Sequence, residues 1–343
     1  MHRITEALMS WYDENAREMP WRGISDPYGT WVSEIMLQQT RVETVRDYYP
    51  RFMERFPTLR DLAEAPEEDV LKMWEGLGYY SRARNLRKGA QQVMSEYGGM
   101  IPREPEQLIR IKGIGPYTSC SIASIAFDVP VPAVDGNVIR VISRVYDLHE
   151  DPTETKAHEK IEQLAAELVP QRRAGDHNQA MMDLGATICV PGTPDCDSCP
   201  LKKMCKAFVA GTAEELPHLP KAKPPKEIAY DVLLIHHKDQ VLMYRRTESM
   251  LQGLWCFPML EGQREEKELI AAVEKKWKLK VKSIIFEQQA KHIFTHQVWE
   301  MSIYTITIEE EKEVEGMEWV KRDQIADLPL PTAMKAAKLT LKL

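Results

Sequence analysis

The sequence predicts a two-domain protein, with an all-helical N-terminal domain followed by a smaller α+β domain. Three observations predict this division. The chain has 343 residues, which is more than one hydrophobic core usually organises. Residues 1–206 carry apolar side chains at helical spacing, whereas residues 228–343 contain several short runs typical of strands. Residues 207–227, rich in proline and charge and without periodicity, are typical of a linker.

Composition limits the class of protein. The formal net charge is −7 and neither half of the chain is basic, so binding to phosphates would depend on local cationic faces, whose field is screened within about 8–10 Å. The sequence shows no apolar run as long as a membrane span and no basic apolar leader. We therefore expect a cytoplasmic protein that acts as a monomer and has no membrane partner.

Two helices are expected at the start of the chain. Apolar residues recur at helical spacing over residues 3–17, and a second helix follows Asp26. Glu34 falls in this second helix among large apolar neighbours. A lone glutamate on a helix usually points to solvent. The alternative is that apolar surroundings raise its pKa, so that it holds a proton near neutral pH and acts as an acid.

A third pattern combines glycine, aromatic and basic residues. A helix over residues 58–74, broken at Pro66, is followed by the segment GLGYYSRARNLRKGA, in which Tyr79 lies in the turn. A flexible turn with stacking surfaces and nearby cations suits the insertion of an aromatic wedge into a base stack. The other interpretation is a turn whose tyrosines fill the core while the arginines are solvated.

The stretch from Leu108 to Asn137 organises the N-terminal domain. Gly113 and Gly115 separate an apolar run from a second helix that opens at Pro116, where the fixed φ of proline suits the first helical position. Without a Cβ, these glycines let the backbone approach a ligand closely, and the N–H groups at the helix start suit a phosphate. The pattern is typical of a sequence-independent grip on a nucleic-acid backbone, although an ordinary helical hairpin would show it too.

Four cysteines form one short cluster, Cys189, Cys196, Cys199 and Cys205, with the spacing C-x6-C-x2-C-x5-C. Four thiolates in one loop can hold zinc or an iron–sulfur cluster. Structural zinc usually shows two C-x2-C pairs, and this loop has one. Because four of the six cysteines fall in this one cluster, the sequence favours a metal site in a reducing compartment over a disulfide framework.

Three segments carry a family resemblance. KGIGPYT at residues 112–118, followed by VDGN at residues 134–137, resembles the helix-hairpin-helix and catalytic aspartate of the DNA glycosylases related to endonuclease III. SEIMLQQT at residues 33–40 resembles the most characteristic segment of the adenine glycosylase branch, the MutY family. The resemblance implies a base-excision repair enzyme that hydrolyses the N-glycosidic bond of adenine mispaired with 8-oxoguanine or guanine in double-stranded DNA, in bacteria at the nucleoid.

The resemblance also implies catalytic roles. Glu34 would protonate the departing adenine. Asp135, which before a helix would more often serve only as an N-cap, would stabilise the oxocarbenium-like sugar, as paired carboxylates do in glycoside hydrolysis. Tyr117 and Asn137 are candidates for orienting groups. Tyr117 also stands where bifunctional relatives carry a lysine that forms a Schiff base, so we expect a monofunctional glycosylase without an efficient lyase step.

Binding residues follow from the same resemblance. The pocket for the extruded base would include Trp21, Arg22 and Gln39, the hairpin glycines Gly113 and Gly115 would hold the DNA backbone, and Tyr79 would wedge beside 8-oxoguanine. A loop that contacts this lesion maps to Phe294, Thr295 and His296, where Thr295 replaces the commoner serine. The residues alone leave a β-hairpin edge with Phe294 in the core as an alternative. The cysteine loop resembles a [4Fe–4S] site.

The C-terminal domain resembles the MutT/Nudix-like domain of the adenine glycosylases. After its first residue, the candidate helix ELIAAVEKKWKL has only Glu274, among lysines, where pyrophosphatases need clustered glutamates, so we expect no metal-dependent hydrolysis. Two other functions stay open. One is a same-fold glycosylase for another mismatched base, and the other is a non-catalytic iron–sulfur DNA-binding protein.

Overall fold

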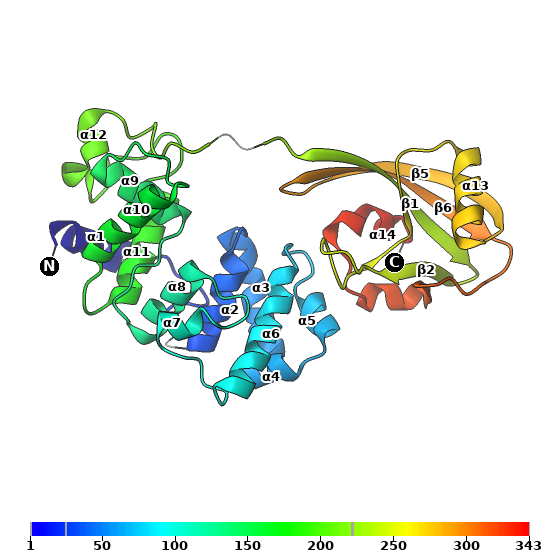
Figure 1. Ribbon diagram of the computed structural model, residues 1–343, viewed down its shortest axis with the longest axis horizontal. Helices are drawn as coiled ribbons and strands as arrows, with labels where there is room; N and C mark the ends of the chain where they lie inside the picture. The colour runs from blue at the N-terminus through cyan, green and yellow to red at the C-terminus, as the bar shows by residue number, and fades with distance from the viewer. Residues whose placement is uncertain (1, 25, 221–222, 343) are drawn as a thin grey trace. The chain divides into compact units, whose positions relative to one another are not determined.

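The computed structural model describes residues 2–24, 26–220 and 223–342. The chain divides into two compact units (Figure 1). We call Met1–Glu64 with Asn85–Lys221 the helical unit, and Ala65–Arg84 with Ala222–Leu343 the mixed unit. In the described part of the chain, no helix combines the length and apolarity that crossing a membrane requires.

The helical unit contains short and medium helices joined by tight turns. They are α1 (Arg3–Asn15), α2 (Pro27–Leu37), α3 (Val42–Arg55), α4 (Leu59–Glu64), most of α6 (Ser81–Glu96), α7 (Pro105–Leu108), α8 (Pro116–Phe127), α9 (Gly136–Tyr146), α10 (Thr155–Leu168), α11 (Ala174–Thr187) and α12 (Lys206–Ala210), with a 3₁₀ turn at Lys202–Met204. The helix expected over residues 3–17 is present and ends two residues earlier, and helices begin after Asp26 and at Pro116 as expected.

Helix α2 begins with a strong capping signal. The side chain of Asp26 accepts hydrogen bonds from the backbone N–H groups of Tyr28 (3.1 Å) and Gly29 (2.9 Å), and Pro27 occupies the first helical position. Every residue from Tyr28 to Met36 is buried. A helix buried on all faces lies inside its unit, and α2 packs against α3 and α8.

The backbone of the hairpin between α7 and α8 requires glycine at one of its two glycine positions. Gly113 has φ +86°, a left-handed conformation that favours glycine, and a Cβ there would lie 2.7 Å from Cβ of Asn85. Gly115 has φ −97° and ψ −179°, an extended conformation open to any residue, and a Cβ there would meet nothing within 4 Å. The fold therefore requires glycine at 113 only, whereas glycine at 115 leaves the backbone open to close approach.

The mixed unit is built on one sheet. Its strands are β1 (Lys226–His237), β2 (Gln240–Arg245), β3 (Trp255–Cys256), β4 (Met259–Glu261), β5 (Val281–Ile293), β6 (Gln297–Ile308) and β7 (Glu318–Lys321). Their order is β3-β2-β1-β6-β5, with β4 paired to β1 and β7 paired to β2. The β1 and β6 strands run parallel, from Lys226 opposite Gln297 to His236 opposite Thr307, and the other pairs are antiparallel.

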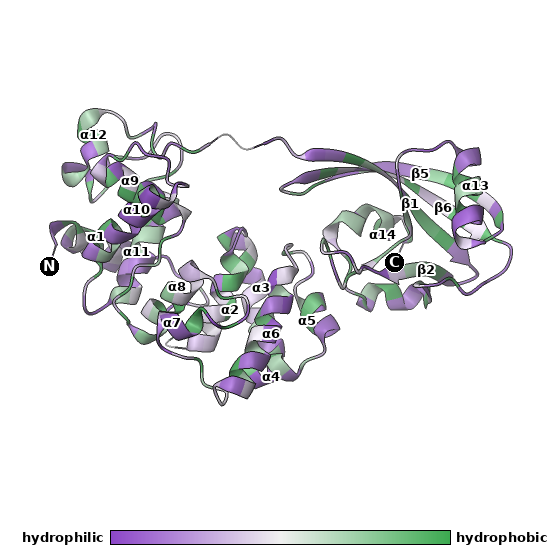
Figure 2. Ribbon diagram, viewed as in Figure 1, coloured by the Kyte–Doolittle hydropathy of each residue, from purple (hydrophilic) through white to green (hydrophobic). Residues whose placement is uncertain are grey.

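Two cores cover the two faces of this sheet. On one face, α13 (Glu266–Trp277) packs Leu269 and Val273 against Leu233 and Ile306. On the other face, the C-terminal α14 (Lys335–Thr340) and a neighbouring 3₁₀ turn pack in the cluster that contains Val232, Trp299 and Met334. Because β1 is covered on both sides, its central residues form the unbroken apolar run that is coloured green in Figure 2.

The segment Ala65–Arg84 departs from the expected domain limits, because it packs with C-terminal residues. Pro66 separates α4 from α5 (Glu67–Met73), as expected from the sequence. The indole Nε1 of Trp255 donates to Glu68 (2.7 Å), and Nζ of Lys72 donates to the backbone oxygen of Ala326 (2.6 Å). An early segment of the chain is therefore part of the mixed unit.

The expected linker is partly structured. Helix α12 (Lys206–Ala210) occupies its first residues, and β1 begins at Lys226, before its expected end. Residues 221 and 222 of this segment lie outside the described residues. The domain limits taken from the sequence stay predictions.

Candidate active site

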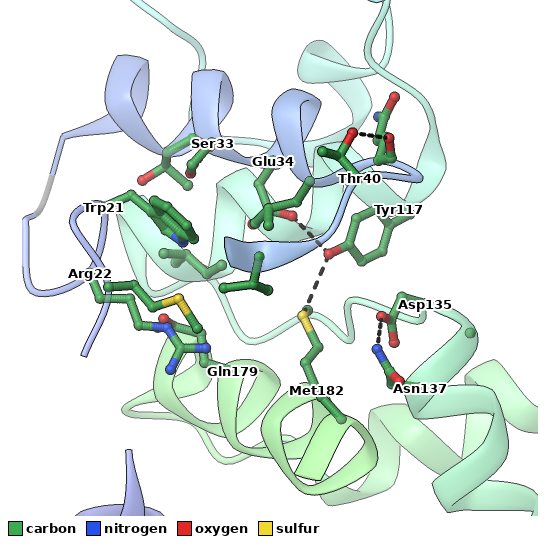
Figure 3. A pocket seen from close by; sticks show the side chains of 18 of the residues that line it. Trp21, Arg22, Ser33, Glu34, Thr40, Tyr117, Asp135, Asn137, Gln179 and Met182 are labelled. Carbon is green, nitrogen blue, oxygen red and sulfur yellow. Dashed lines mark hydrogen bonds between the residues drawn. The ribbon is translucent and has the colours of Figure 1, made fainter. Parts of the chain in front are cut away.

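One cavity of about 550 Å³ lies within the helical unit. This volume is in the range of small-molecule sites. Its walls come from the loop before α2, from α2 and the turn after it, from α8, from the start of α9 and from α11. The cavity brings together all seven residues expected to act on the base and sugar: Trp21, Arg22, Glu34, Gln39, Tyr117, Asp135 and Asn137. Figure 3 shows the labelled members of this group.

Glu34 is buried, with 6% of its surface exposed, so the interpretation that it faces solvent is wrong. The hydroxyl of Tyr117 donates to Oε2 of Glu34 (2.8 Å), as Figure 3 shows. Burial raises the pKa of the Glu34 carboxyl; the hydrogen bond from Tyr117 and the polar Ser121 side chain oppose this rise, the charge of Asp135 adds to it, and the charge of Arg22 opposes it. Glu34 therefore keeps its proton to a higher pH than an ordinary glutamate, which suits an acid. Its catalytic role stays a prediction.

Tyr117 is a neutral donor in this site. Burial, followed by the charges of Glu34 and Asp135, raises the pKa of its hydroxyl well above the usual value. The same hydroxyl lies 3.5 Å from the sulfur of Met182 on α11. Tyr117 is thus fixed between α2 and α11, and none of the described residues that line this cavity is a lysine.

Asp135 serves as an N-cap and faces the cavity at the same time. Its Oδ1 accepts from the backbone N–H of Val138 (2.8 Å), which caps α9, and its Oδ2 accepts from Nδ2 of Asn137 (2.8 Å). The Asn137 side chain is held in turn by Nη2 of Arg140 (2.8 Å). Close packing adds to this, since a Cβ on Gly185 would lie 2.6 Å from Cβ of Asn137. The carboxylate is therefore oriented by its surroundings rather than free to rotate.

The expected base pocket forms the opposite wall. Trp21 is buried and makes an edge contact with Tyr49, with ring centroids 5.6 Å apart. Gln39 follows the end of α2 with φ +56°, a left-handed conformation that is uncommon for a residue with a side chain. Such backbone strain tends to gather at functional sites. Both residues line the cavity, and their contact with a base stays a prediction.

Three lining residues lie outside the motifs quoted above and were missed by the sequence analysis: Arg17, Gln179 and Met182. Gln179 and Met182 lie three positions apart on α11, and Figure 3 shows both on the side of that helix that faces the pocket. Helical spacing could have placed them on one face. Nothing in the sequence indicated that this face meets Glu34.

A second cavity, of about 500 Å³, lies within the mixed unit. It brings together the four residues expected to contact the lesion: Tyr79, Phe294, Thr295 and His296. The hydroxyls of Tyr79 and Thr295 are hydrogen-bonded to each other although the residues are 216 positions apart in the chain. Tyr79 has φ +46° and is 43% exposed, so it does not fill the core. Phe294 lines the cavity and also packs on Trp299, with ring centroids 4.9 Å apart.

The hairpin glycines lie apart from both cavities, since neither lines one. Lys112 and Gly113 are exposed at the turn. The turn is therefore accessible to a DNA backbone, and its phosphate contact stays a prediction.

The four clustered cysteines line one small cavity of the helical unit. Buried Arg144 organises their loop: its guanidinium donates to the backbone oxygens of Val190 (2.8 Å) and Gly192 (3.1 Å), and Nη1 lies 3.4 Å from Sγ of Cys189. Burial, with the neighbouring thiolates, raises the pKa of Cys199 to about 11. Among the described residues, no three cysteine, histidine or acidic side chains converge on one ion. The structure does bring all four cysteines of the sequence motif to this one cavity.

Two family models match the chain, one in each part. A model described as HhH-GPD superfamily base excision DNA repair protein matches residues 32–170, and a NUDIX domain model matches residues 231–338. The first covers Glu34, Tyr117 and Asp135. The all-α and MutT/Nudix-like α+β domains expected from the sequence are thereby confirmed.

Sequence and structure comparisons extend this match. The adenine DNA glycosylase of Mus musculus is 34% identical over 390 residues, covering 96% of this chain and 76% of the relative. A thermostable thymine-DNA glycosylase structure has a TM-score of 0.56 and 29% identity, covering 60% of this chain and 95% of that one. A trapped endonuclease III–DNA covalent intermediate has a TM-score of 0.52 at 24% identity, covering 60% and 94%, and shows the same fold. Since the match to the mouse enzyme spans nearly the whole sequence, the chain belongs to the adenine DNA glycosylase family.

Proposed function

We propose that this DNA N-glycosylase, acting as a monomer, removes adenine mispaired with 8-oxoguanine or guanine in double-stranded DNA. The observation that carries the proposal is the shared cavity of Glu34 and Asp135, one carboxyl buried with a raised pKa and the other oriented on the opposite wall. A base inside the stack cannot reach buried groups, so the adenine would be extruded into this cavity. The family names of its relatives support adenine as the base.

The reaction uses the two carboxyls differently. The proton of Glu34 passes to a ring nitrogen of adenine, the bond between that base and C1′ of the sugar breaks, and adenine leaves as a neutral molecule. The negative charge of Asp135 stabilises the positive charge that develops on the sugar. Water then adds at C1′, and the proton that it loses restores the acid. Tyr117 holds Glu34 in place through its 2.8 Å hydrogen bond.

Strand cleavage is not part of this reaction. A lyase step needs an amine that attacks C1′ to form a Schiff base. Tyr117 supplies a hydroxyl with a raised pKa at the position of that amine, and the described lining residues include no lysine. Incubation of the product duplex at neutral pH should leave the strand intact until base or heat is added. Nicking that keeps pace with adenine release would contradict this assignment.

We further propose that the cavity of the mixed unit recognises 8-oxoguanine on the opposite strand. Exposed Tyr79 offers a stacking surface, and Thr295 offers a hydroxyl, with His296 and Phe294 beside it. Helix α13 carries Glu266 and Glu268 in its first turn and only Glu274 in its later turns, where the carboxylate of Glu274 accepts from the backbone N–H of Val281 (3.2 Å). This supports a domain that binds a base without hydrolysing nucleotides. Phosphate release from nucleoside triphosphates by the full chain would argue against it.

The four cysteines would hold a [4Fe–4S] cluster, which supplies structural stability and a docking surface to the loop rather than chemistry on the substrate. Support comes from the four thiols around one cavity and from the fold shared with endonuclease III. Purified protein should contain about four irons per chain and lose DNA affinity when Cys199 is replaced by serine. Zinc in place of iron, with full activity, would overturn the cluster assignment.

The experiment that tests the proposed reaction is single-turnover release of base from a panel of duplexes. One duplex carries adenine opposite 8-oxoguanine, one carries adenine opposite guanine, and one carries thymine opposite guanine, because a thymine-DNA glycosylase shares the fold. Release of adenine from the first two is expected. Release of thymine alone would assign another base to this chain, and binding without release from any duplex would indicate a non-catalytic DNA-binding protein.

A further inference from the structure

A buried carboxylate behind the active-site cavity holds two arginines. Asp183 on α11 has no exposed side-chain surface. Its Oδ2 accepts from Nη1 of Arg22 (2.6 Å) and its Oδ1 from Nη2 of the same residue (2.9 Å). Oδ1 also accepts from Nε of Arg17 (2.8 Å) and from Nη2 of Arg17. One carboxylate thus binds two guanidinium groups in a two-pronged arrangement.

This arrangement matters because Arg22 lines the same cavity as Glu34. The charged or titratable groups that act on Glu34 are Tyr117 from α8, Asp135 from the loop before α9, and Arg22 from the loop before α2, and Ser121 of α8 adds a hydroxyl. Arg22 is the cation in this set; Arg17 lines the same cavity but is not among the groups that shift the pKa of Glu34. A guanidinium is the side chain best matched to a carboxylate, and pairing with one stabilises the ionised form.

Asp183 competes for that cation. Both terminal amino groups of Arg22 donate to Asp183, and Nη1 donates also to the backbone oxygen of Arg17 (3.1 Å). Burial alone would raise the pKa of Asp183, but the hydrogen bonds from Arg22 and Arg17 outweigh burial and lower it, so Asp183 stays ionised. The hydrogen bonds and charge of Asp183 likewise raise the pKa of Arg22 against the effect of burial.

We propose that Asp183 is a positioning residue that occupies the amino groups of Arg22, keeps that guanidinium from pairing with Glu34, and so leaves the acid its proton. The inference rests on the proposed function, since it concerns the same acid. Helix α11 would then have an electrostatic role, through Asp183, in addition to lining the cavity. Asp183 acts through Arg22 and touches no reacting atom.

The test is the pH dependence of single-turnover adenine release by the full-length protein between pH 5 and 9. Asp183→Asn keeps the shape of the side chain and one acceptor but removes its charge. A freed Arg22 then stabilises ionised Glu34, so the alkaline fall in rate should move to lower pH by about one unit, a roughly tenfold loss on that limb. The rate on the acid plateau should stay within about threefold of the native rate.

Two variants separate this effect from damage to the fold. Arg22→Met in combination with Asp183→Asn removes the freed cation, and the alkaline limb should return to the native pH or above it even if the plateau falls. Asp176→Asn is the matched control, because Asp176 lies on the same helix and accepts from Nε of Arg173 (2.8 Å) at the surface. That control should leave the limb where it is.

The outcomes distinguish the two proposals. If the native protein releases no adenine, the proposed function fails. If the native protein is active with an alkaline limb, and Asp183→Asn lowers the rate equally at every pH, Asp183 is only structural and the inference fails alone. If the alkaline fall in rate stays at the lower pH in the double variant, the inference also fails, because the shift would then not depend on Arg22.

Discussion

The two cavities differ in the kind of side chain that each contains. The cavity of the helical unit contains buried ionisable groups with shifted pKa values, among them Glu34 at 6% exposure and Tyr117. The cavity of the mixed unit is lined by aromatic rings, hydroxyls, imidazoles and Arg84, with Tyr79 43% exposed, and none of its described lining residues is a carboxylic acid. Buried acids with altered proton affinity are suited to bond breaking, whereas exposed rings and hydroxyls are suited to recognition. The comparison supports the proposed division, in which the helical unit carries the chemistry and the mixed unit recognises the lesion.

The largest effect expected from this division is the loss of single-turnover rate when the charge of Asp135 is removed. Asparagine caps a helix about as well as aspartate, so Asp135→Asn should keep α9 folded while it removes the charge that we propose stabilises the sugar. We expect a loss of roughly 10²–10³-fold in the single-turnover rate, the size seen when one electrostatic group of a transition state is removed. DNA affinity should change little. A rate within threefold of the native rate would show that Asp135 is only an N-cap.

The second effect is a difference between rate and binding as pH rises. Because burial raises the pKa of Glu34, the acid is protonated below that pKa and loses its proton above it, so the rate should fall about tenfold per pH unit on the alkaline side. If the mixed unit recognises the lesion as proposed, affinity for lesion DNA should stay level over that range. Parallel titration of rate and dissociation constant checks this, and a matched decline of both would place the titrating group in binding.

A smaller effect is expected in the mixed unit. Thr295→Val preserves shape and removes the hydroxyl that is hydrogen-bonded to Tyr79. One hydrogen bond contributes about 0.5–1.5 kcal/mol, so the preference for adenine opposite 8-oxoguanine over adenine opposite guanine should fall by roughly fivefold. Thr295→Ser is the matched control, since it keeps the hydroxyl, and its preference should stay near the native value. A loss of preference in Thr295→Ser, with the native preference kept in Thr295→Val, would mean that packing of the methyl group rather than the hydroxyl sets the preference.

The smallest effect tests where the segment Ala65–Arg84 belongs. Trp255→Phe removes the indole N–H that donates to Glu68 (2.7 Å) and should lower the free energy of unfolding of the mixed unit by about 1 kcal/mol. Glu68→Gln retains an acceptor and should cost less. Denaturant unfolding followed by hydrogen exchange would resolve the two units. A loss confined to the helical unit would be inconsistent with this assignment.

Local patterns predicted much of this molecule. Asp26 and Pro27 gave the start of α2, the glycine turn gave the hairpin, and the cysteine spacing gave a thiol site, because capping, turn geometry and short spacings depend on neighbouring residues. The sequence alone could not decide whether Glu34 faces solvent or is buried with a raised pKa. Family resemblance, rather than periodicity, selected it as the acid.

Long-range contacts could not be predicted in this way. Arg22 and Asp183 are 161 positions apart, and nothing in their local sequence indicates that they pair. The same holds for the packing of α5 with C-terminal residues such as Trp255. An amphipathic pattern indicates that one face of a helix is buried but not which element covers it. Tertiary packing decides these contacts.

The most direct test of the proposed division between chemistry and lesion recognition compares the native protein with Glu34→Gln. The substrate is a duplex with one adenine opposite 8-oxoguanine, and both the single-turnover rate and the dissociation constant are measured. Removal of a general acid predicts a rate loss of about 10²–10⁴-fold, with affinity for the duplex unchanged within about threefold, because the lesion cavity is intact. A variant that still releases adenine at the native rate, or that loses affinity in proportion to rate, would contradict the division of chemistry and recognition between the two units.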